Sequence, residues 1–276
     1  MTMKVILAID SAWTVHNPSG VAVIKSDGNK WSCAGVAPSY NSFIGLADGK
    51  QVDWRQGKVP GSVANIPVLL NAAGRLAGAQ VDIVTIDMPI SIMPITGSRI
   101  ADREIGTAFG KYKAAAYTPN EQRPGQLGKD ISDAFRSSGY QLATQLCHAG
   151  EVKRLIEVYP HPALVRLLNL TERLKYKVSK SKKYWPKDTL ATRIENLLEN
   201  FKTAYIALGD HIGFSTPKGN LCFPDTAATL AELKPYEDAL DALVCAWIGI
   251  CYCSGKAESY GDDTAAIWVP TKPEAR

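Results

Sequence analysis

The sequence predicts a mixed α/β fold in which three antiparallel strands are followed by two parallel strands. Apolar runs of strand length lie close together near the start of the chain, and their short connections favour an antiparallel meander. Two later apolar runs are separated by stretches of helical periodicity, which is typical of parallel strands joined by helical crossovers. The chain has 276 residues, of which 46% are hydrophobic and 21% are charged, so it can bury a large core without disulfide bonds or structural metal ions.

The order of the expected elements follows the apolar runs. The run at 82–88 is apolar on both faces, so we expect a central strand parallel to the first one. The region 38–60 has no clear period and is expected to be a loop. Strands are expected at 4–9, 19–25, 30–37, 82–88 and 155–159, and the residues 267–270 are expected to form a short apolar strand or a tail. Helices are expected at 63–79, 99–109, 130–149, 161–170, from a cap at Asp188 to Gly209, and from Pro235 to Cys253. We expect one domain over residues 1–276, with insertions at about 91–150 and 171–225.

Composition restricts the class of protein. The net charge of +4 is mild and does not by itself require a polyanionic partner. The six cysteines show no paired spacing, so reduced thiols are expected and a zinc site is not. The longest apolar run, 242–253, is too short to span a bilayer, and the first residues lack the pattern of a signal peptide. We therefore expect a cytoplasmic protein with no membrane partner.

Carboxylates end or interrupt several of these apolar runs. Asp10 ends the first run, Asp87 ends the run at the fourth strand, and Glu157 lies in the fifth. Asp238 and Asp241 are three residues apart on the last helix, on one face of it. Carboxyl ends of neighbouring parallel strands share a sheet edge, and clustered carboxylates need a positive partner, for which Mg²⁺ or Mn²⁺ is suited. The pattern predicts metal ligands at Asp10, Asp87, Asp238 and Asp241, and catalytic acids at Asp10, Asp87, Asp241 and Glu157.

Most of these acids also have a purely structural interpretation. Asp10 could be a turn or cap residue, and Asp238 could be a first-turn acid that favours the helix dipole. Glu157 could pair with a basic neighbour such as Arg166. Asp241 is harder to explain in this way, because it interrupts an otherwise apolar stretch of the last helix.

The sequence blocks around these acids resemble a known family. The blocks are IDSAW, IDMPIS, GSRIADREI, EVYPHPAL, DALDALVCAW and YGDDTAAIWVP. Together they extend from about Lys4 to Pro270 and resemble the domain-of-unknown-function 429 family, which is regarded as a family of predicted nucleases of RNase H fold. The resemblance implies an RNase H-like five-stranded sheet flanked by helices, with metal ligands at Asp10, Asp87 and the Asp238/Asp241 pair. Glu157 lies outside the set that such nucleases usually use.

A further block matches the Gly-x-Arg-x-x-Asp segment of that family. It contains Gly97, Arg99 and Asp102, and it follows Asp87 closely in the chain. Arg99 or Arg103 could reach a substrate phosphate from this position. The alternative is a capped helix start with an internal Arg–Asp pair.

Basic and aromatic residues predict contact with a nucleic acid. The segment 173–187 holds seven basic residues and no acidic one, with Tyr176, Tyr184 and Trp185 between them. Phosphate contacts and base stacking need these residue types, whereas a solvated loop is the alternative. Trp13, beside Asp10, could stack on a base or simply pack the strand end. The expected phosphate contacts are Lys180, Lys182 and Lys183.

Three functions are consistent with this sequence. The leading one is a Mg²⁺- or Mn²⁺-dependent nuclease or phosphodiesterase that acts on DNA or RNA. The second is a non-catalytic nucleic-acid-binding protein of the same fold. The third, an actin-like ATP-dependent phosphotransferase, is disfavoured because IDSAW lacks the expected glycine and no clear phosphate loop follows it.

Overall fold

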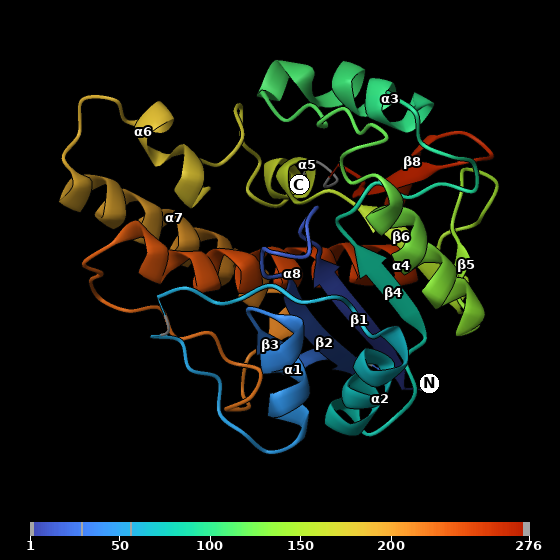
Figure 1. The fold of residues 1–276 in the computed structure, drawn as a ribbon, viewed down its shortest axis with the longest axis horizontal. Coiled ribbons are helices and arrows are strands. Elements are labelled where there is room, and N and C mark those ends of the chain that lie inside the picture. The colour runs from blue at the N-terminus through green and yellow to red at the C-terminus, as the bar shows by residue number, and fades with distance from the viewer. Residues whose placement is uncertain (1–2, 29, 56, 273–276) are drawn as a thin grey trace.

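The structure is a computed structural model that describes residues 3–28, 30–55 and 57–272. Nine strands of the described residues form one sheet (Figure 1). They are β1 (Lys4–Asp10), β2 (Gly20–Ser26), β3 (Trp31–Ala37), β4 (Ile83–Ile86), β5 (Gln141–Leu142), β6 (Arg154–Val158), β7 (Ile212–Gly213), β8 (Ala257–Gly261) and β9 (Ala266–Pro270). Their order across the sheet is β7-β3-β2-β1-β4-β6-β9-β8, and β5 pairs with β6 beside this path.

The centre of the sheet has the arrangement predicted from the sequence. Strands β1, β2 and β3 pair antiparallel, and β4 and β6 continue the sheet in parallel. The sheet is larger than the expected five strands, because β9 and β8 extend it beyond β6 and β7 adds to β3. Strands β5 and β7 are two residues long and β8 is mostly polar, so none of the three has an apolar run that would mark it.

Helices cover both faces of this sheet (Figure 1). Helices α1 and α2 pack on one face with α4, while α7 and α8 pack on the other. None of the helices in the described ranges is long and apolar enough to cross a membrane. The helices are α1 (Tyr40–Ala47), α2 (Ile66–Ala77), α3 (Ile100–Phe109), α4 (Gln126–Ser137), α5 (Pro160–Leu167), α6 (Ser181–Tyr184), α7 (Leu190–Gly209) and α8 (Leu230–Cys253), with short 3₁₀ turns η1 (Gly110–Tyr112) and η2 (Val178–Lys180).

Side-chain alternation along β1 decides which face its final acid occupies. Val5, Leu7 and Ile9 pack against α1 and α2, whereas Ile6 and Ala8 pack against α8. Successive side chains of a strand point to opposite faces, so the residue at position 10 belongs to the α8 face. The same alternation in β4 brings the residue at position 87 to that face, because Ile83 packs there and Ile86 packs on the other.

Two expectations about helices were wrong in the first half of the chain. The expected loop at 38–60 contains α1, whose N-cap Ser39 accepts a hydrogen bond from the Ser42 amide. The expected helix at 130–149 begins earlier, at Gln126, and ends at Ser137. Gly139 follows with a φ of 92°, which turns the chain into β5. Helical periodicity therefore identified the region but not the turn within it.

Two helix starts were also misplaced in the second half. The N-cap of α7 is Thr189, which accepts a hydrogen bond from the Thr192 amide, and not Asp188. Helix α8 begins at Leu230, so Pro235 lies inside it rather than at its start. Proline has no amide hydrogen, which makes it a common first-turn residue, so Pro235 was the expected helix start. The expected domain extent of 1–276 stays a prediction, and its residues 1–2 and 273–276 lie outside the described ranges.

Candidate functional site

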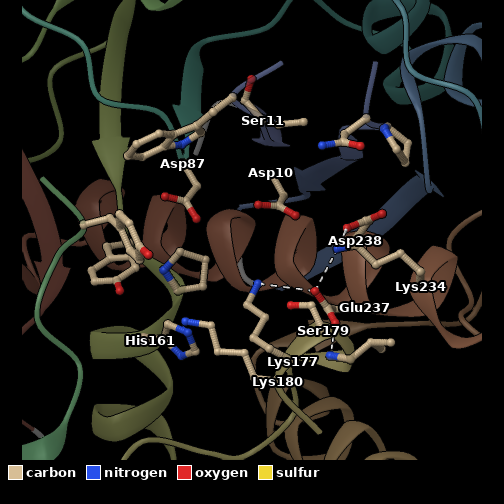
Figure 2. Close-up of a pocket in the computed structure, with 18 of the residues that line it drawn as sticks. Asp10, Ser11, Asp87, His161, Lys177, Ser179, Lys180, Lys234, Glu237 and Asp238 are labelled. Carbon is tan, nitrogen blue, oxygen red and sulfur yellow. Dashed lines mark hydrogen bonds and ion pairs between the residues drawn. The ribbon is translucent and has the colours of Figure 1, made fainter. Parts of the chain in front are cut away.

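A pocket of about 1260 Å³ lies where β1 and β4 end and α8 begins. Asp10 and Asp87 point into it from the strand ends, and Asp238 and Lys177 also line it (Figure 2). Asp241, one turn further along α8, lies beneath the pocket and is fully buried. The expected convergence of the two parallel strands and the last helix is therefore present in the fold.

A glycine on β2 allows α8 to reach the end of β1. Gly20 pairs with Asp10 across the two strands. A Cβ atom on Gly20 would lie 1.9 Å from the backbone oxygen of Asp238, which is far inside van der Waals contact. Only glycine permits this approach, and the approach places Asp238 beside Asp10.

The acids of α8 are paired with cations inside the protein. Asp241 accepts hydrogen bonds from the Tyr176 hydroxyl and the Lys177 amine, both at 2.5 Å. Glu237 accepts one from the Lys234 amine at 2.8 Å, and Lys234 also bonds Asp238 at 2.5 Å. The second carboxylate oxygen of Asp238, Oδ2, is buried and has no partner among the described residues.

The two acids at the strand ends have no such partner. Within the described ranges, no side-chain hydrogen bond or ion pair reaches Asp10 or Asp87. Burial raises the pKa of Asp10 well above its usual value, and the nearby charges of Asp241, Asp87 and Asp238 raise it further against the opposing effect of Lys177. Burial likewise raises the pKa of Asp87 to about 7. The charge of Lys177 offsets this rise only in part, so the ionised forms of both carboxylates are incompletely stabilised.

The donor chemistry of this pocket suits a hard divalent cation. The groups without partners are carboxylate oxygens of Asp10, Asp87 and Asp238, and Mg²⁺ or Mn²⁺ prefers such ligands. Three or more acidic, histidine or cysteine side chains positioned together for a metal ion are not found in the described part of the chain. The residues fit such an ion by type and location, although they are not arranged as a finished coordination shell.

Glu157 lines the same pocket and adds to the rise in the pKa of Asp87 that burial causes, but strand alternation places it on the opposite face of the sheet from Asp10 and Asp87. It pairs in register with Ile86, whose side chain packs on the face away from α8. There it accepts hydrogen bonds from the Ile90 amide at 3.0 Å and from both terminal nitrogens of Arg99 at 2.6 Å. The alternative partner considered from the sequence, Arg166, pairs with Glu258 instead.

Arg99 and Asp102 form the capped helix start that was the alternative interpretation. The Asp102 carboxylate accepts hydrogen bonds from the Arg99 backbone amide and guanidinium. The remaining guanidinium hydrogens go to Glu157 and to the Ile90 carbonyl, so all five are used. Arg103 is exposed and donates to the Ser98 carbonyl. A phosphate contact by either arginine stays a prediction, and Arg99 has no donor free for it.

The basic segment forms one wall of the pocket. Lys180, Lys182 and Lys183 line the pocket, and so does Trp13. Tyr176 is fully buried and bonded to Asp241, so the stacking role considered for it is wrong.

The sequence analysis predicted Asp238 but missed three other charged residues of the site, which are Lys177, Lys234 and Glu237. Lys234, Glu237 and Asp238 are spaced i, i+3 and i+4, which on a helix is a detectable ion-pair pattern. Lys177 had no such signal, because it is one of seven basic residues in its segment. His161 lines the pocket, and its Nδ1 atom has no hydrogen-bond partner among the residues that the structure describes. Burial, followed by the charge of Lys177, holds its pKa well below the usual value.

Comparison with known proteins identifies the family. Residues 9–266 match the family model described as "Protein of unknown function (DUF429)". The chain belongs to the DUF429 family. No curated protein and no solved structure matches it. The match includes Asp10, Asp87, Asp238 and Asp241, and the family description assigns no activity.

Proposed function

We propose that this DUF429 protein is a Mg²⁺- or Mn²⁺-dependent nuclease or phosphodiesterase of RNase H-like fold. One observation carries the proposal. Asp10 and Asp87 end neighbouring parallel strands, face one pocket, and make no ion pair or side-chain hydrogen bond among the described residues. Buried acids without partners cost stability, so their placement in an open pocket supports binding of an external cation.

The central topology supports the same proposal. The order β3-β2-β1-β4-β6, with three antiparallel and two parallel strands, is the arrangement that the family resemblance implies for an RNase H-like sheet. Helix α8 crosses this sheet and brings Asp238 and Asp241 to the strand ends. An acid on the first strand, one on the fourth and a pair on the last helix is the ligand set expected of that fold.

The side chains of the pocket have different roles in this proposal. We assign Asp10, Asp87 and the free oxygen of Asp238 to holding the cation, while Lys177 and Tyr176 fix Asp241 beneath them. A bound divalent ion would supply positive charge for a phosphoryl oxygen and a water of lowered pKa. Lys180 and its neighbours in the wall bind substrate phosphates.

Two substitutions test this function. Asp10→Asn and Asp87→Asn keep the shape of the side chains but remove charge, so each is expected to abolish metal-dependent cleavage of DNA and RNA. Calorimetric titration with Mn²⁺ is expected to show binding by the wild type and a loss of at least tenfold in affinity in each variant. Asp48→Asn, in an exposed ion pair with Arg75, is the matched control. Equal cleavage by wild type and both variants would refute the site.

A second function is favoured by one observation. Lys177 and Lys234 already neutralise part of the acidic cluster, which lowers its need for a metal ion. A non-catalytic nucleic-acid-binding protein would show tight, salt-sensitive binding to DNA or RNA with no turnover in Mg²⁺ or Mn²⁺.

A further inference from the structure

The pocket contains an aromatic–cation wall, defined here as Trp13, Tyr117, Arg123 and Lys180. The Trp13 and Tyr117 rings meet edge to face with centroids 6.3 Å apart. The Arg123 guanidinium lies 5.9 Å from the centre of the Trp13 ring, and the Lys180 amine lies 5.8 Å from that of Tyr117. All four side chains line the pocket that contains Asp10. Figure 2 shows Lys180 beside Lys177 and His161.

Tyr117 is placed for contact with something outside the folded chain. Its side chain lies on the loop between η1 and α4, and the residue is 72% exposed. Within the described ranges no hydrogen bond reaches its hydroxyl, and its ring contacts are those with Trp13 and Lys180. The ring therefore offers an open face next to a cation, which is the geometry of a stacking platform.

The cations of this wall make no ion pair with an acid in the described part of the chain. The same holds for Lys182 and Lys183, which line the pocket next to Lys180 in the sequence. Burial lowers the pKa of Lys180, and repulsion from Arg173 and Lys183 lowers it further. A ligand that carries several negative charges would relieve this repulsion.

The size and layout of the pocket restrict that ligand further. At about 1260 Å³ the pocket exceeds the roughly 300–1,000 Å³ of typical small-molecule sites. Cations and rings lie in its wall, and the acids lie at its floor. A nucleic-acid strand matches this layout, because its phosphates can contact the cations of the wall and its bases can stack on the rings. In a duplex the base faces are covered by their neighbours, so only unpaired bases can stack on an aromatic side chain.

We propose that the aromatic–cation wall is a subsite for single-stranded nucleic acid, in which Trp13 and Tyr117 stack on unpaired bases and Arg123 and Lys180 contact the flanking phosphates. This inference rests on the proposed function for the chemistry at the floor, and it adds the class of substrate. The strand lies along the wall, and one phosphate reaches Asp10 and Asp87.

Binding without turnover tests the subsite independently of hydrolysis. Fluorescence anisotropy is measured in EDTA with a labelled 12-nucleotide single strand, a blunt duplex of the same sequence, and the same strand with abasic positions. The wild type is expected to bind the intact single strand most tightly. Trp13→Ala and Tyr117→Ala are each expected to weaken that binding by about 5- to 100-fold, and to leave binding of the abasic strand unchanged. Tyr117 is exposed, so its variant remains informative if Trp13→Ala fails to fold.

The phosphate contact is tested by comparing a lysine variant in the wall with a lysine variant outside the pocket. Lys180→Ala is expected to reduce the slope of log affinity against log salt by about 0.7 for a single strand. Lys111 lies 5.0 Å from the Tyr112 ring centre, a similar lysine–tyrosine contact outside the pocket, and Lys111→Ala is expected to change nothing.

The outcomes separate this inference from the proposed hydrolysis. Equal wild-type affinity for duplex and single strand, or an equal loss by the Tyr117 variant on the abasic strand, would overturn the subsite alone. Single-strand binding that depends on Tyr117, together with no Mn²⁺ binding in calorimetry, would support the subsite and overturn the hydrolysis.

Discussion

Two charged networks lie within the same pocket region, and they differ in how completely they are paired. In the closed network, defined as Arg99, Asp102 and Glu157, all five guanidinium hydrogens have acceptors. In the open network at the strand ends, Asp10 and Asp87 have no side-chain donor within the described ranges. A complete network holds the fold together, whereas an incomplete one in a pocket leaves capacity for a ligand.

The largest expected effect comes from breaking the closed network. Arg99→Met leaves the buried carboxylates of Asp102 and Glu157 without their cation, so we expect a loss of about 3–5 kcal/mol in the free energy of unfolding. Urea denaturation measures this loss. Arg103→Met, at an exposed neighbour, is expected to stay within about 0.5 kcal/mol. A loss below about 1 kcal/mol for the Arg99 variant would show that the network is not structural.

The close contact between α8 and the end of β2 depends on Gly20, so a substitution there should move α8 away from Asp10. Gly20→Ala forces a methyl group against the Asp238 backbone, and we expect a loss of about 1–3 kcal/mol or more in unfolding free energy. Mn²⁺ affinity should fall with it, because Asp238 moves away from Asp10. Gly106→Ala is the control, since a Cβ there meets no atom and helix propensity favours alanine. Wild-type Mn²⁺ affinity in the Gly20 variant would contradict the role of this approach.

The open network also predicts how stability depends on pH. The pKa of Asp87 is about 7 in the folded protein and 3.8 as its ordinary value, so the folded state retains the proton longer. The free energy of unfolding should therefore fall as pH rises from about 4 to about 7, and level off above that. Burial also raises the pKa of Asp10, so that acid adds a dependence of the same sign. Asp87→Asn removes the share of Asp87 and should stabilise the metal-free protein at pH 8 by about 1–2 kcal/mol.

Thermal melts with and without Mn²⁺ check this prediction. Added Mn²⁺ should raise the wild-type midpoint more at pH 8 than at pH 5, because the ion competes with protons for the carboxylates. The Asp87→Asn variant should lose most of that rise. A metal-induced shift that is equal at both pH values would show that these acids do not bind the ion.

The smallest effect is expected from Lys234, the half-exposed cation that pairs with Asp238 beside the open network. The Lys234 side chain is 43% exposed, so water can replace much of its pairing in Lys234→Met, and the expected loss is about 1 kcal/mol. The change also frees Asp238, and calorimetry should show tighter Mn²⁺ binding than in the wild type. Weaker Mn²⁺ binding would mean that Lys234 orients Asp238 for the ion.

The sequence by itself determined the central strands and the acids at their ends. Apolar runs mark β1 and β4 directly, and a parallel pair brings its carboxyl ends to one edge, which is why Asp10 and Asp87 could be predicted as neighbours. The last helix was identified by its apolar length, and the spacing of Asp238 and Asp241 follows from helix geometry.

Only the tertiary structure decided which charges meet. Glu157 lies on the other face of the sheet from Asp10 and Asp87 because it pairs in register with Ile86, and a register cannot be obtained from one strand's sequence. Lys177 lies 64 residues from Asp241 in the chain and reaches it because the basic segment packs along α8. Long-range ion pairs depend on packing rather than on local pattern, so the sequence predicted the acids of this site but not the cations that hold them.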